Sequence, residues 1–362
     1  MKAYIGMSGG VDSAVSAALL KEEGFDVTGV FIRVWQPDWI TCAWREERLE
    51  AMRAAAHLGI PFLTLNLERQ YKRDVIDYMT AEYGSGRTPN PDVMCNRTIK
   101  FGAFWDWARE RGADYIATGH YARVARDDGY LKLLAGTDKS KDQSYFLWTL
   151  RQADLRHILL PVGGMIKSEV RSLAKRLGLP NAEKKDSQGL CFIGKMNVKE
   201  FLSHSIETVP GIVLDQSGEN IGAHPGASLF TIGERHGFVI DAKHKSPSDE
   251  PYYVIDKDIW QNTLTVSNRG AAGALPLAQK KVRVSGLNWH RGSIPEATDD
   301  AEAFPFRARH RYRQPLEKIR VSRAAITETI FEFERPQDTI TPGQSLVIYD
   351  GEECLGGGII ED

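Results

Sequence analysis

A candidate nucleophile stands in the stretch GRTPNPDVMCNRTIKF, residues 86–101. Cys95 follows two prolines and an aspartate, and Arg97 and Lys100 come shortly after it. A helical pattern, IKFGAFWDWARE, follows, so the sulfur is expected near a helix N-terminus and near two cations. Both features lower the pKa of a thiol and raise the fraction of the nucleophilic thiolate. The stretch therefore predicts a loop that presents a reactive cysteine, and the alternative is a small apolar residue of the core.

A second chemical motif, SGGVDS at residues 8–13, follows the first apolar run and opens the first helical pattern. Backbone N–H groups of a glycine-rich turn and of a helix N-terminus bind phosphate oxygens. Ser8 and Ser13 add hydroxyl groups, and Asp12 suits the helix dipole or a magnesium ion. No lysine follows as in GxxxxGK[ST], so a Walker A loop is not expected. The alternative is a tight turn that leads into a serine-capped helix.

The glycine motif resembles the pyrophosphate loop of ATP pyrophosphatases, which cleave ATP between the α and β phosphates and transfer AMP to a substrate. This resemblance implies an adenine nucleotide α-hydrolase fold, an ATP site and Mg²⁺ as the metal. The residues that it implies for ATP are Gly6, Met7, Ser8, Gly9, Gly10, Val11, Asp12, Ser13, Ile32 and Gly119. GMP, NAD and argininosuccinate synthetases resemble the loop too, so it does not identify the acceptor of AMP.

The acceptor is indicated by two cysteine motifs, TPNPDVMCNRTIKF and KKDSQGLCFIG, which together resemble the bacterial tRNA-specific 2-thiouridylases. The resemblance continues through ADYIATGHYAR, DKSKDQSYFL, RYRQP, TPGQS and CLGGGII, and so covers nearly the whole chain. It implies ATP-dependent replacement of the O2 oxygen of the wobble uridine by sulfur. A carbonyl oxygen is a poor leaving group, and adenylation converts it into departing AMP.

Site roles follow from the same resemblance. Cys191 carries sulfur as a persulfide, Cys95 is the partner nucleophile, and a disulfide between them ends the reaction. Asp92 is a candidate acid or base. The residues implied at the target base are Asn90, Pro91 and Asp92, and those implied at other tRNA contacts are His120, Lys141, Asp142, Gln143, Arg311, Tyr312 and Gln344. The alternative for His120 is a structural histidine.

A persulfide-donating sulfur-relay protein is the implied partner besides tRNA. An iron–sulfur cluster on Cys95, Cys191 and Asp92 stays open as an alternative, although two cysteines are fewer thiolates than such clusters usually have. The other two cysteines, Cys42 and Cys354, are expected to be packing residues. Because no CxxC pair occurs, neither a zinc knuckle nor a structural disulfide framework is expected.

An arginine row is predicted in FRARHRYRQ, residues 306–314. On a strand, alternate residues share one face, so Arg307, Arg309, Arg311 and Arg313 would line up toward RNA phosphates. The alternative is a solvated face of a barrel. A base inside a stacked anticodon loop is inaccessible, so the uridine must be splayed out toward Cys95.

The elements that must position these residues fall into two kinds of pattern. The first two hundred residues alternate short apolar runs with helical patterns, which predicts an α/β domain with a mostly parallel sheet covered on both faces. From about Ser203 onward, β-like runs with turn signals predict a small β-rich module and then a β-barrel, with Asp350 and Gly351 at a hairpin. Glycines that follow helical patterns are expected to be left-handed caps, namely Gly24, Gly59, Gly84 and Gly112.

Length and charge set the organisation of the chain. The 362 residues suggest two or three domains of about 150 residues each. The predicted domains are a pyrophosphate-loop catalytic domain at 1–202, a central β-rich domain at 203–270 and a C-terminal β-barrel domain at 271–362. The net charge of -2 requires any nucleic-acid binding to come from local patches. Neither a membrane span nor a signal-peptide core is evident, which predicts a cytoplasmic protein.

The predicted function is that of an ATP-dependent tRNA 2-thiouridylase. Two alternatives are a pyrophosphate-loop ligase that adenylates a small metabolite and an RNA-binding module that uses ATP only as a ligand. Release of pyrophosphate that requires tRNA separates the three. The ligase would not need tRNA, and the binding module would release none.

Overall fold

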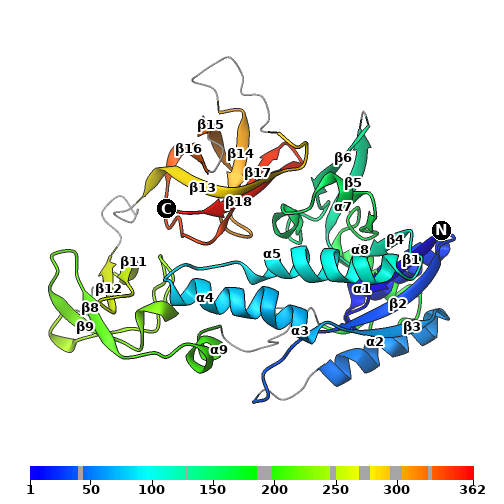
Figure 1. The fold of residues 1–362 in the computed structure, drawn as a ribbon, viewed down its shortest axis with the longest axis horizontal. Coiled ribbons are helices and arrows are strands. Elements are labelled where there is room, and N and C mark those ends of the chain that lie inside the picture. The colour runs from blue at the N-terminus through cyan, green and yellow to red at the C-terminus, as the bar shows by residue number, and fades with distance from the viewer. Residues whose placement is uncertain are drawn as a thin grey trace.

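The computed structural model describes residues 1–39, 44–127, 129–185, 198–244, 250–268, 278–293, 304–324 and 328–362. Its strands form three sheets (Figure 1). Within these ranges, no helix has the length and apolar character needed to cross a membrane.

The first sheet is parallel throughout, as the alternation of apolar runs and helical patterns predicts. Its order is β3-β2-β1-β4-β7, and each neighbouring pair runs in the same direction. Parallel neighbours need crossover connections, so helices cover both faces of such a sheet. The strands are β1 (Lys2–Gly6), β2 (Asp26–Arg33), β3 (Phe62–Asn66), β4 (Tyr115–Ala117) and β7 (Ile158–Leu159).

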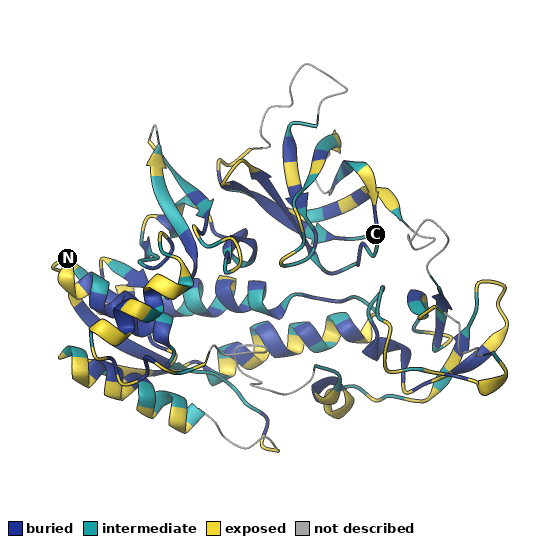
Figure 2. Cartoon of the chain, turned by 180° about the vertical axis from the view of Figure 1, so that it is seen from behind, coloured by how far each residue is buried: buried dark blue, intermediate teal, exposed yellow. Residues whose placement is uncertain are grey.

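Two separate cores lie on the two faces of this sheet. Ala3 and Ile5 of β1 pack with one face's helices, whereas Tyr4 between them packs on the other face, as the two-residue period of a strand requires. The helices of the first face are α1 (Val11–Glu22), α2 (Trp44–Leu58) and α8 (Lys167–Arg176). Figure 2 shows exposed residues along the outer side of α2, while the sheet behind it is largely buried.

Two long helical runs cover the other face and extend toward the C-terminal half (Figure 1). The first run joins α3 (Glu68–Tyr71), the π-helical segment η1 (Lys72–Asp77) and α4 (Tyr78–Gly84). The second joins α5 (Pro91–Cys95), the π-helical segment η2 (Asn96–Ala103) and α6 (Phe104–Arg109). π-helical turns are rare and occur frequently at functional sites. Both runs contain such a segment, and the segment of the second run begins directly after Cys95.

The second sheet belongs to the central part of the chain and has the order β10-β9-β8-β12-β11. Only β8 and β12 pair in parallel among its described neighbours. Its elements are α9 (Val198–Ser205), β8 (Gly211–Leu214), β9 (Asn220–His224), the 3₁₀ turns η4 (Ala227–Leu229) and η5 (Ala242–His244), β10 (Val239–Ile240), β11 (Tyr253–Asp258) and β12 (Thr263–Ser267).

The third sheet closes into the predicted barrel. Its strands follow the order β13-β16-β15-β14-β17-β18, and β13 pairs with β18 to close the ring. Gly351, with φ 55°, turns the chain between β17 and β18, which confirms the predicted hairpin. The strands are β13 (Gln279–Trp289), β14 (Phe306–Arg309), β15 (Glu317–Ala324), β16 (Glu328–Gln337), β17 (Ser345–Asp350) and β18 (Glu353–Ile360).

A hairpin from the N-terminal half extends the barrel sheet, a feature that the sequence patterns did not predict. It consists of β5 (Ala122–Asp127) and β6 (Tyr130–Ala135), and Leu133 of β6 pairs with Cys354 of β18. The 3₁₀ turn η3 (Ser144–Leu147) and α7 (Gln152–Leu155) follow the hairpin. The N-terminal half of the chain and the barrel are thus joined through a shared sheet.

Three of the four predicted glycine caps are confirmed. Gly24, Gly59 and Gly112 have φ of 85°, 63° and 74°, in the left-handed region. The prediction for Gly84 is wrong, because α4 continues through Gly84 and the left-handed residue is Gly86, with φ 83°.

Candidate active site

The glycine loop joins β1 to α1 as the sequence predicts. Gly9 has φ 76°, and a Cβ there would lie 2.5 Å from the carbonyl oxygen of Glu47, so the position requires glycine. Gly10 is the N-cap of α1 and provides no side-chain cap. Ser8 and Ser13 hydroxyls bond within the loop, with Ser13 Oγ accepting from Ser8 N at 3.3 Å. The N-terminus of α1 therefore has no capping side chain, as an anion-binding helix end requires.

Residues distant in sequence hold this loop in place. The amide of Asn181 donates to the carbonyl oxygens of Gly9 and Gly10, each at 3.0 Å. Gly119, which follows β4, approaches so closely that a Cβ would lie 2.8 Å from Ser13 N. The family resemblance implied Gly119 as an ATP residue. Asn181 was not predicted, because nothing in the sequence around it except its place after a helix points to the loop. The loop is thus fixed from two further segments.

The remaining residues expected at ATP line the buried base of the loop. Met7 is 2 % exposed and Val11 is 4 % exposed, so both contribute through their backbone. Ile32 of β2 lies beside Gly6, since a Cβ on Gly6 would lie 3.9 Å from Ile32 Cδ1. These residues and the loop occupy the carboxyl ends of β1 and β2, where parallel sheets bind ligands.

Asp12 is engaged by two side chains. Lys167 Nζ contacts its Oδ1 at 2.7 Å and its Oδ2 at 2.9 Å. The hydroxyl of Tyr121 donates to Oδ1 at 2.8 Å. Lys167 is the first residue of α8, and only 12 % of its side chain is exposed. A lysine therefore does stand at the loop, although no lysine follows the loop in sequence.

Cys95 is placed differently from the prediction. The helix begins about two turns before the expected pattern, because Pro91 takes its first position and Asn90 caps it by accepting from Val93 N at 3.3 Å. Cys95 thus lies in the second turn of a helix and is 3 % exposed, packed within the larger core. The prediction of a loop-presented cysteine is wrong, because the Asn90 cap and Pro91 extend the helix across the motif.

The barrel docks onto the segment that leads into this helix. Thr88 N donates to the carbonyl oxygen of Pro342 at 2.8 Å. The amide of Gln344 donates to the carbonyl oxygens of Thr88 at 2.8 Å and Pro89 at 3.2 Å. Gly343, with φ 90°, has no room for a Cβ, which would lie 2.9 Å from the Thr88 backbone. Gln344 is thereby brought beside the segment containing Asn90, Pro91 and Asp92.

Aromatic side chains that the sequence reasoning missed surround this junction. Tyr145 donates from its hydroxyl to Ser345 O at 3.0 Å, and burial raises its pKa. The ring of Phe146 lies 4.4 Å from that of Tyr312, centroid to centroid. Asn96, next to Cys95, donates to Phe146 O at 3.2 Å. Tyr312, predicted to contact tRNA, therefore belongs to an aromatic group at the helix of Cys95.

Two predicted tRNA contacts are used inside the protein. Asp142 is 3 % exposed, and its Oδ1 accepts from the backbone N–H groups of Gly136 and Ser144, each at 3.0 Å. Gln143 Oε1 accepts from Tyr121 N at 2.9 Å. The buried carboxylate of Asp142 is therefore not presented to RNA, whereas Lys141 beside it is half-buried.

The predicted arginine row is wrong. β14 ends at Arg309, so only its first two arginines share a strand. Arg309 forms an ion pair with Asp142 at 3.3 Å. Arg311 donates to Ile232 O at 2.8 Å and to two barrel oxygens, so it joins the central sheet to the barrel. The exposed members are Arg307 and Arg313, and Arg313 has φ 66°.

His120 lies between the two groups of residues. It is 8 % exposed, and its Nδ1 lies 2.7 Å from Thr118 Oγ1. Burial, followed by the charge of Lys100, holds the pKa of His120 well below its usual range, so the ring is neutral. Because Gly119 touches the glycine loop and His120 faces the helix of Cys95, residues 118–121 join the two groups.

Of the other cysteines, the structure describes Cys354. It is fully buried in β18, and burial raises the pKa of its thiol, which confirms a packing residue. Cys42 and the predicted persulfide carrier Cys191 lie outside the described residues.

Comparisons with known proteins cover all three sheets. Residues 1–195 match the family model described as tRNA methyl transferase HUP domain, residues 199–268 match the tRNA methyl transferase PRC-barrel domain, and residues 279–360 match the aminomethyltransferase beta-barrel domain.

The chain is 43% identical over 364 residues to tRNA-specific 2-thiouridylase MnmA of Streptococcus sanguinis (strain SK36), with 100% of this chain and 95% of the relative covered. It is 45% identical over 365 residues to tRNA-specific 2-thiouridylase MnmA 2 of Geobacillus kaustophilus (strain HTA426), with the same shares covered. It is 45% identical over 361 residues to tRNA-specific 2-thiouridylase MnmA of Streptococcus pyogenes serotype M3 (strain SSI-1), with 99% of this chain and 94% of the relative covered.

Proposed function

The chain belongs to the tRNA-specific 2-thiouridylase family, and we propose that it catalyses ATP-dependent 2-thiolation of the wobble uridine of tRNA, with release of AMP and pyrophosphate. One observation carries the proposal. The glycine loop touches Gly119, and His120 faces the helix of Cys95. Activation by ATP at O2 and sulfur transfer at C2 act on the same carbonyl group, so both groups must meet at one base.

ATP fits the glycine loop. Its phosphates would accept from the uncapped N–H groups of α1 and from Lys167, which supplies the positive charge. A magnesium ion is part of the proposal, with Asp12 as its protein ligand. Mg²⁺ in such sites is held largely by phosphate oxygens and water, so one carboxylate suffices, and Lys167 would turn to the phosphates.

Sulfur transfer would use both cysteines. The O2 oxygen of uridine attacks the α-phosphorus of ATP, and pyrophosphate leaves. The terminal sulfur of a Cys191 persulfide then bonds to C2, while the thiolate of Cys95 attacks the inner sulfur and breaks the S–S bond. AMP leaves with the former O2, and a Cys95–Cys191 disulfide remains, which a thiol reductant reopens with two electrons. Asp92 is the candidate to accept the N3 proton.

The burial of Cys95 defines a requirement of this scheme. A thiol that is 3 % exposed cannot meet a base or a second cysteine without movement of its surroundings. The helix of Cys95 packs on η1 and η3, and the barrel docks on the segment that leads into it, where tRNA would bind beside Tyr312, Asn90 and Gln344. Binding of tRNA is therefore proposed to open this junction. Domain boundaries after residues 202 and 270, a persulfide-donating sulfur-relay protein and a cytoplasmic location complete the proposal.

The proposal is tested by incubating the protein with unmodified tRNA, ATP, a persulfide donor and reductant. Mass spectrometry of the digested tRNA should show 2-thiouridine, and pyrophosphate release should depend on tRNA. Release without tRNA would favour a small-molecule ligase. No release at all would favour an RNA-binding module.

A further inference from the structure

A cavity of about 530 Å³ lies at the edge of the parallel sheet opposite the glycine loop. Its walls include Met1, Asp114 and His157, which come just before or at the starts of β1, β4 and β7. The glycine loop and Gly119 instead follow the carboxyl ends of β1 and β4. The cavity is therefore a second site, separated from the first by the length of the strands.

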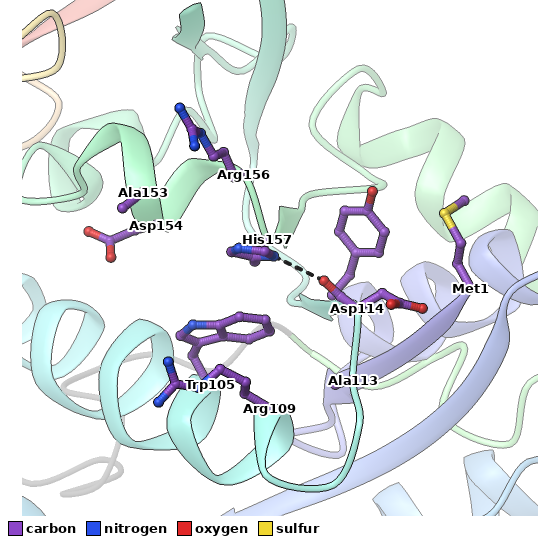
Figure 3. Close-up of a pocket in the computed structure, with 10 residues that line it drawn as sticks. Met1, Trp105, Arg109, Ala113, Asp114, Ala153, Asp154, Arg156 and His157 are labelled. Atoms are coloured by element: carbon purple, nitrogen blue, oxygen red, sulfur yellow. Dashed lines mark hydrogen bonds between the residues drawn. The ribbon is translucent and has the colours of Figure 1, made fainter.

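One wall of the cavity is a stacked aromatic pair. The rings of Trp105 and His157 lie 4.4 Å apart with an interplanar angle of 18°. Figure 3 shows the His157 ring above the Trp105 ring and its contact with Asp114. His157 Nδ1 lies 3.2 Å from the backbone oxygen of Asp114, so Nδ1 donates to that carbonyl and the ring is held in place. Such a fixed flat surface suits the stacking of a nucleobase.

The cavity contains two arginines and two carboxylates, and the guanidinium groups are the less engaged of these four groups. Arg156 is exposed and makes no hydrogen bond or ion pair with any residue that the structure describes. Arg109 has only an exposed contact with Asp106 at 3.5 Å, which is weak. Both carboxylates of the cavity are turned to nearby donors, since Asp114 accepts from Lys2 N at 2.7 Å and Asp154 accepts from Arg151 N at 2.8 Å.

We propose that this cavity binds a nucleotide, with its base on the Trp105–His157 surface and its phosphate at Arg109 and Arg156. Guanidinium groups bind phosphate through charge-assisted hydrogen bonds, and the volume lies within the usual range of small-molecule sites. The proposal does not depend on the thiolation chemistry. A free mononucleotide and a nucleotide within RNA share the recognised chemistry, and the experiment separates them.

Photoaffinity labelling tests the site directly. The full-length protein is irradiated with 8-azido-AMP or, separately, with tRNA carrying 8-azidoadenosine, and the labelled peptides are mapped by mass spectrometry. Label on the peptide of Trp105 or His157 is the expected result. Label from the mononucleotide identifies a free-nucleotide site, and label from tRNA alone identifies an RNA contact.

Charge reversal provides the matched variants. Arg109→Glu with Arg156→Glu should lower labelling at this site about tenfold or more, because two cations of the phosphate site are lost. Arg126→Glu with Arg176→Glu, two exposed arginines elsewhere on the domain, should leave it unchanged. Thermal melting checks that each variant folds, and Arg156→Ala replaces the double variant if it does not. Equal labelling in the wild-type protein and the Arg109/Arg156 variants, or label confined to the glycine loop, would overturn the proposal.

Discussion

Gln344 in the barrel donates from its side-chain amide to the carbonyl oxygen of Thr88, 2.8 Å away, at the entry to the helix of Cys95. The same amide reaches the next carbonyl, that of Pro89, at 3.2 Å. These carbonyls precede Asn90, whose side chain caps the helix. Gln344 of the barrel thus holds the segment that leads into the helix.

Replacement of Gln344 tests this docking. Gln344→Leu keeps the size of the side chain but removes both hydrogen bonds, so the free energy of unfolding should fall by about 1–3 kcal/mol. The rate of thiolation should fall as well, because the base-proximal segment is no longer held. Denaturant unfolding and nucleoside analysis measure the two effects, with the exposed Gln261→Leu as control. Normal thiolation in a destabilised Gln344→Leu protein would reduce the contact to a structural one.

Lys167 is predicted to bind phosphate as well as to pair with Asp12. Lys167→Met should lower kcat/KM for tRNA-dependent pyrophosphate release by about a hundredfold, the size of a lost charge-assisted contact, and leave tRNA affinity unchanged. Asp12→Asn should also abolish adenylation without loss of fold. Lys175→Met on the same helix is the control.

A double variant separates the two roles of Lys167. If Lys167 serves only to position Asp12, then Lys167→Met should cause no further loss in the Asp12→Asn protein. An additional loss is expected, because the ammonium would contact the phosphates directly. Because Asp12→Asn leaves no adenylation to measure, the additional loss is read as weaker ATP binding by isothermal titration calorimetry.

The arginines of residues 306–314 are predicted to act in two different ways. Arg311→Met leaves three part-buried oxygens without this donor, so it should cost about 3 kcal/mol of unfolding free energy. Arg313→Ala should instead change stability by less than about 0.5 kcal/mol and reduce the salt dependence of tRNA affinity by a slope of about one. Unchanged salt dependence in Arg313→Ala and in Arg307→Ala would make both residues ordinary solvated side chains.

His310 gives the protein a predicted acid sensitivity. Burial, followed by the charge of Arg311, lowers the pKa of His310 from 6.5 to about 4. Between these two values the unfolded chain binds a proton that the folded protein does not. The free energy of unfolding is therefore highest above pH 6.5 and falls as the pH drops toward 4. This amounts to up to about 3 kcal/mol. His310→Gln should flatten the difference in unfolding free energy between pH 7 and pH 4.5 relative to wild type, and an equal slope in both proteins would contradict it.

The sequence predicted those parts of the site that depend on local backbone rules. The glycine loop lies between a strand and a helix, as predicted. Position 9 requires glycine, because its backbone is left-handed and a Cβ would clash with Glu47. The parallel sheet and the hairpin at Gly351 follow in the same way from local periodicity and turn chemistry. The arginine pattern failed because a two-residue period does not show where a strand ends, and β14 ends at Arg309.

Contacts over long sequence distances were beyond such rules. Lys167 reaches Asp12 across 155 positions, and nothing near either residue encodes that pair. The burial of Cys95 has the same origin, since the core that contains it is built from segments far apart in the sequence. Asn90 followed by Pro91 is a typical helix start. The prediction placed the helix start after Cys95 and therefore missed this cap.

The two cysteines are predicted to fail differently when each is replaced. Cys191→Ser should accept no persulfide but still support tRNA-dependent pyrophosphate release, because adenylation uses only the glycine loop. Cys95→Ser should load a persulfide on Cys191 yet make little 2-thiouridine and form no internal disulfide. Cys354→Ser is the control for a buried cysteine that takes no part in the chemistry.

Intact-protein mass spectrometry after loading, with and without reductant, distinguishes these states. Because Cys95 is buried, alkylation of its thiol in the wild-type protein should be slow and should accelerate when tRNA and ATP are added. Acceleration is expected only if the junction opens on substrate binding, and Gln344→Leu should raise the basal rate by loosening the same junction. Persulfide on Cys95 in the Cys191→Ser protein would reverse the two roles. Full thiolation by either serine variant would remove the two-cysteine scheme, and substrate-independent alkylation of Cys95 would remove the opening step.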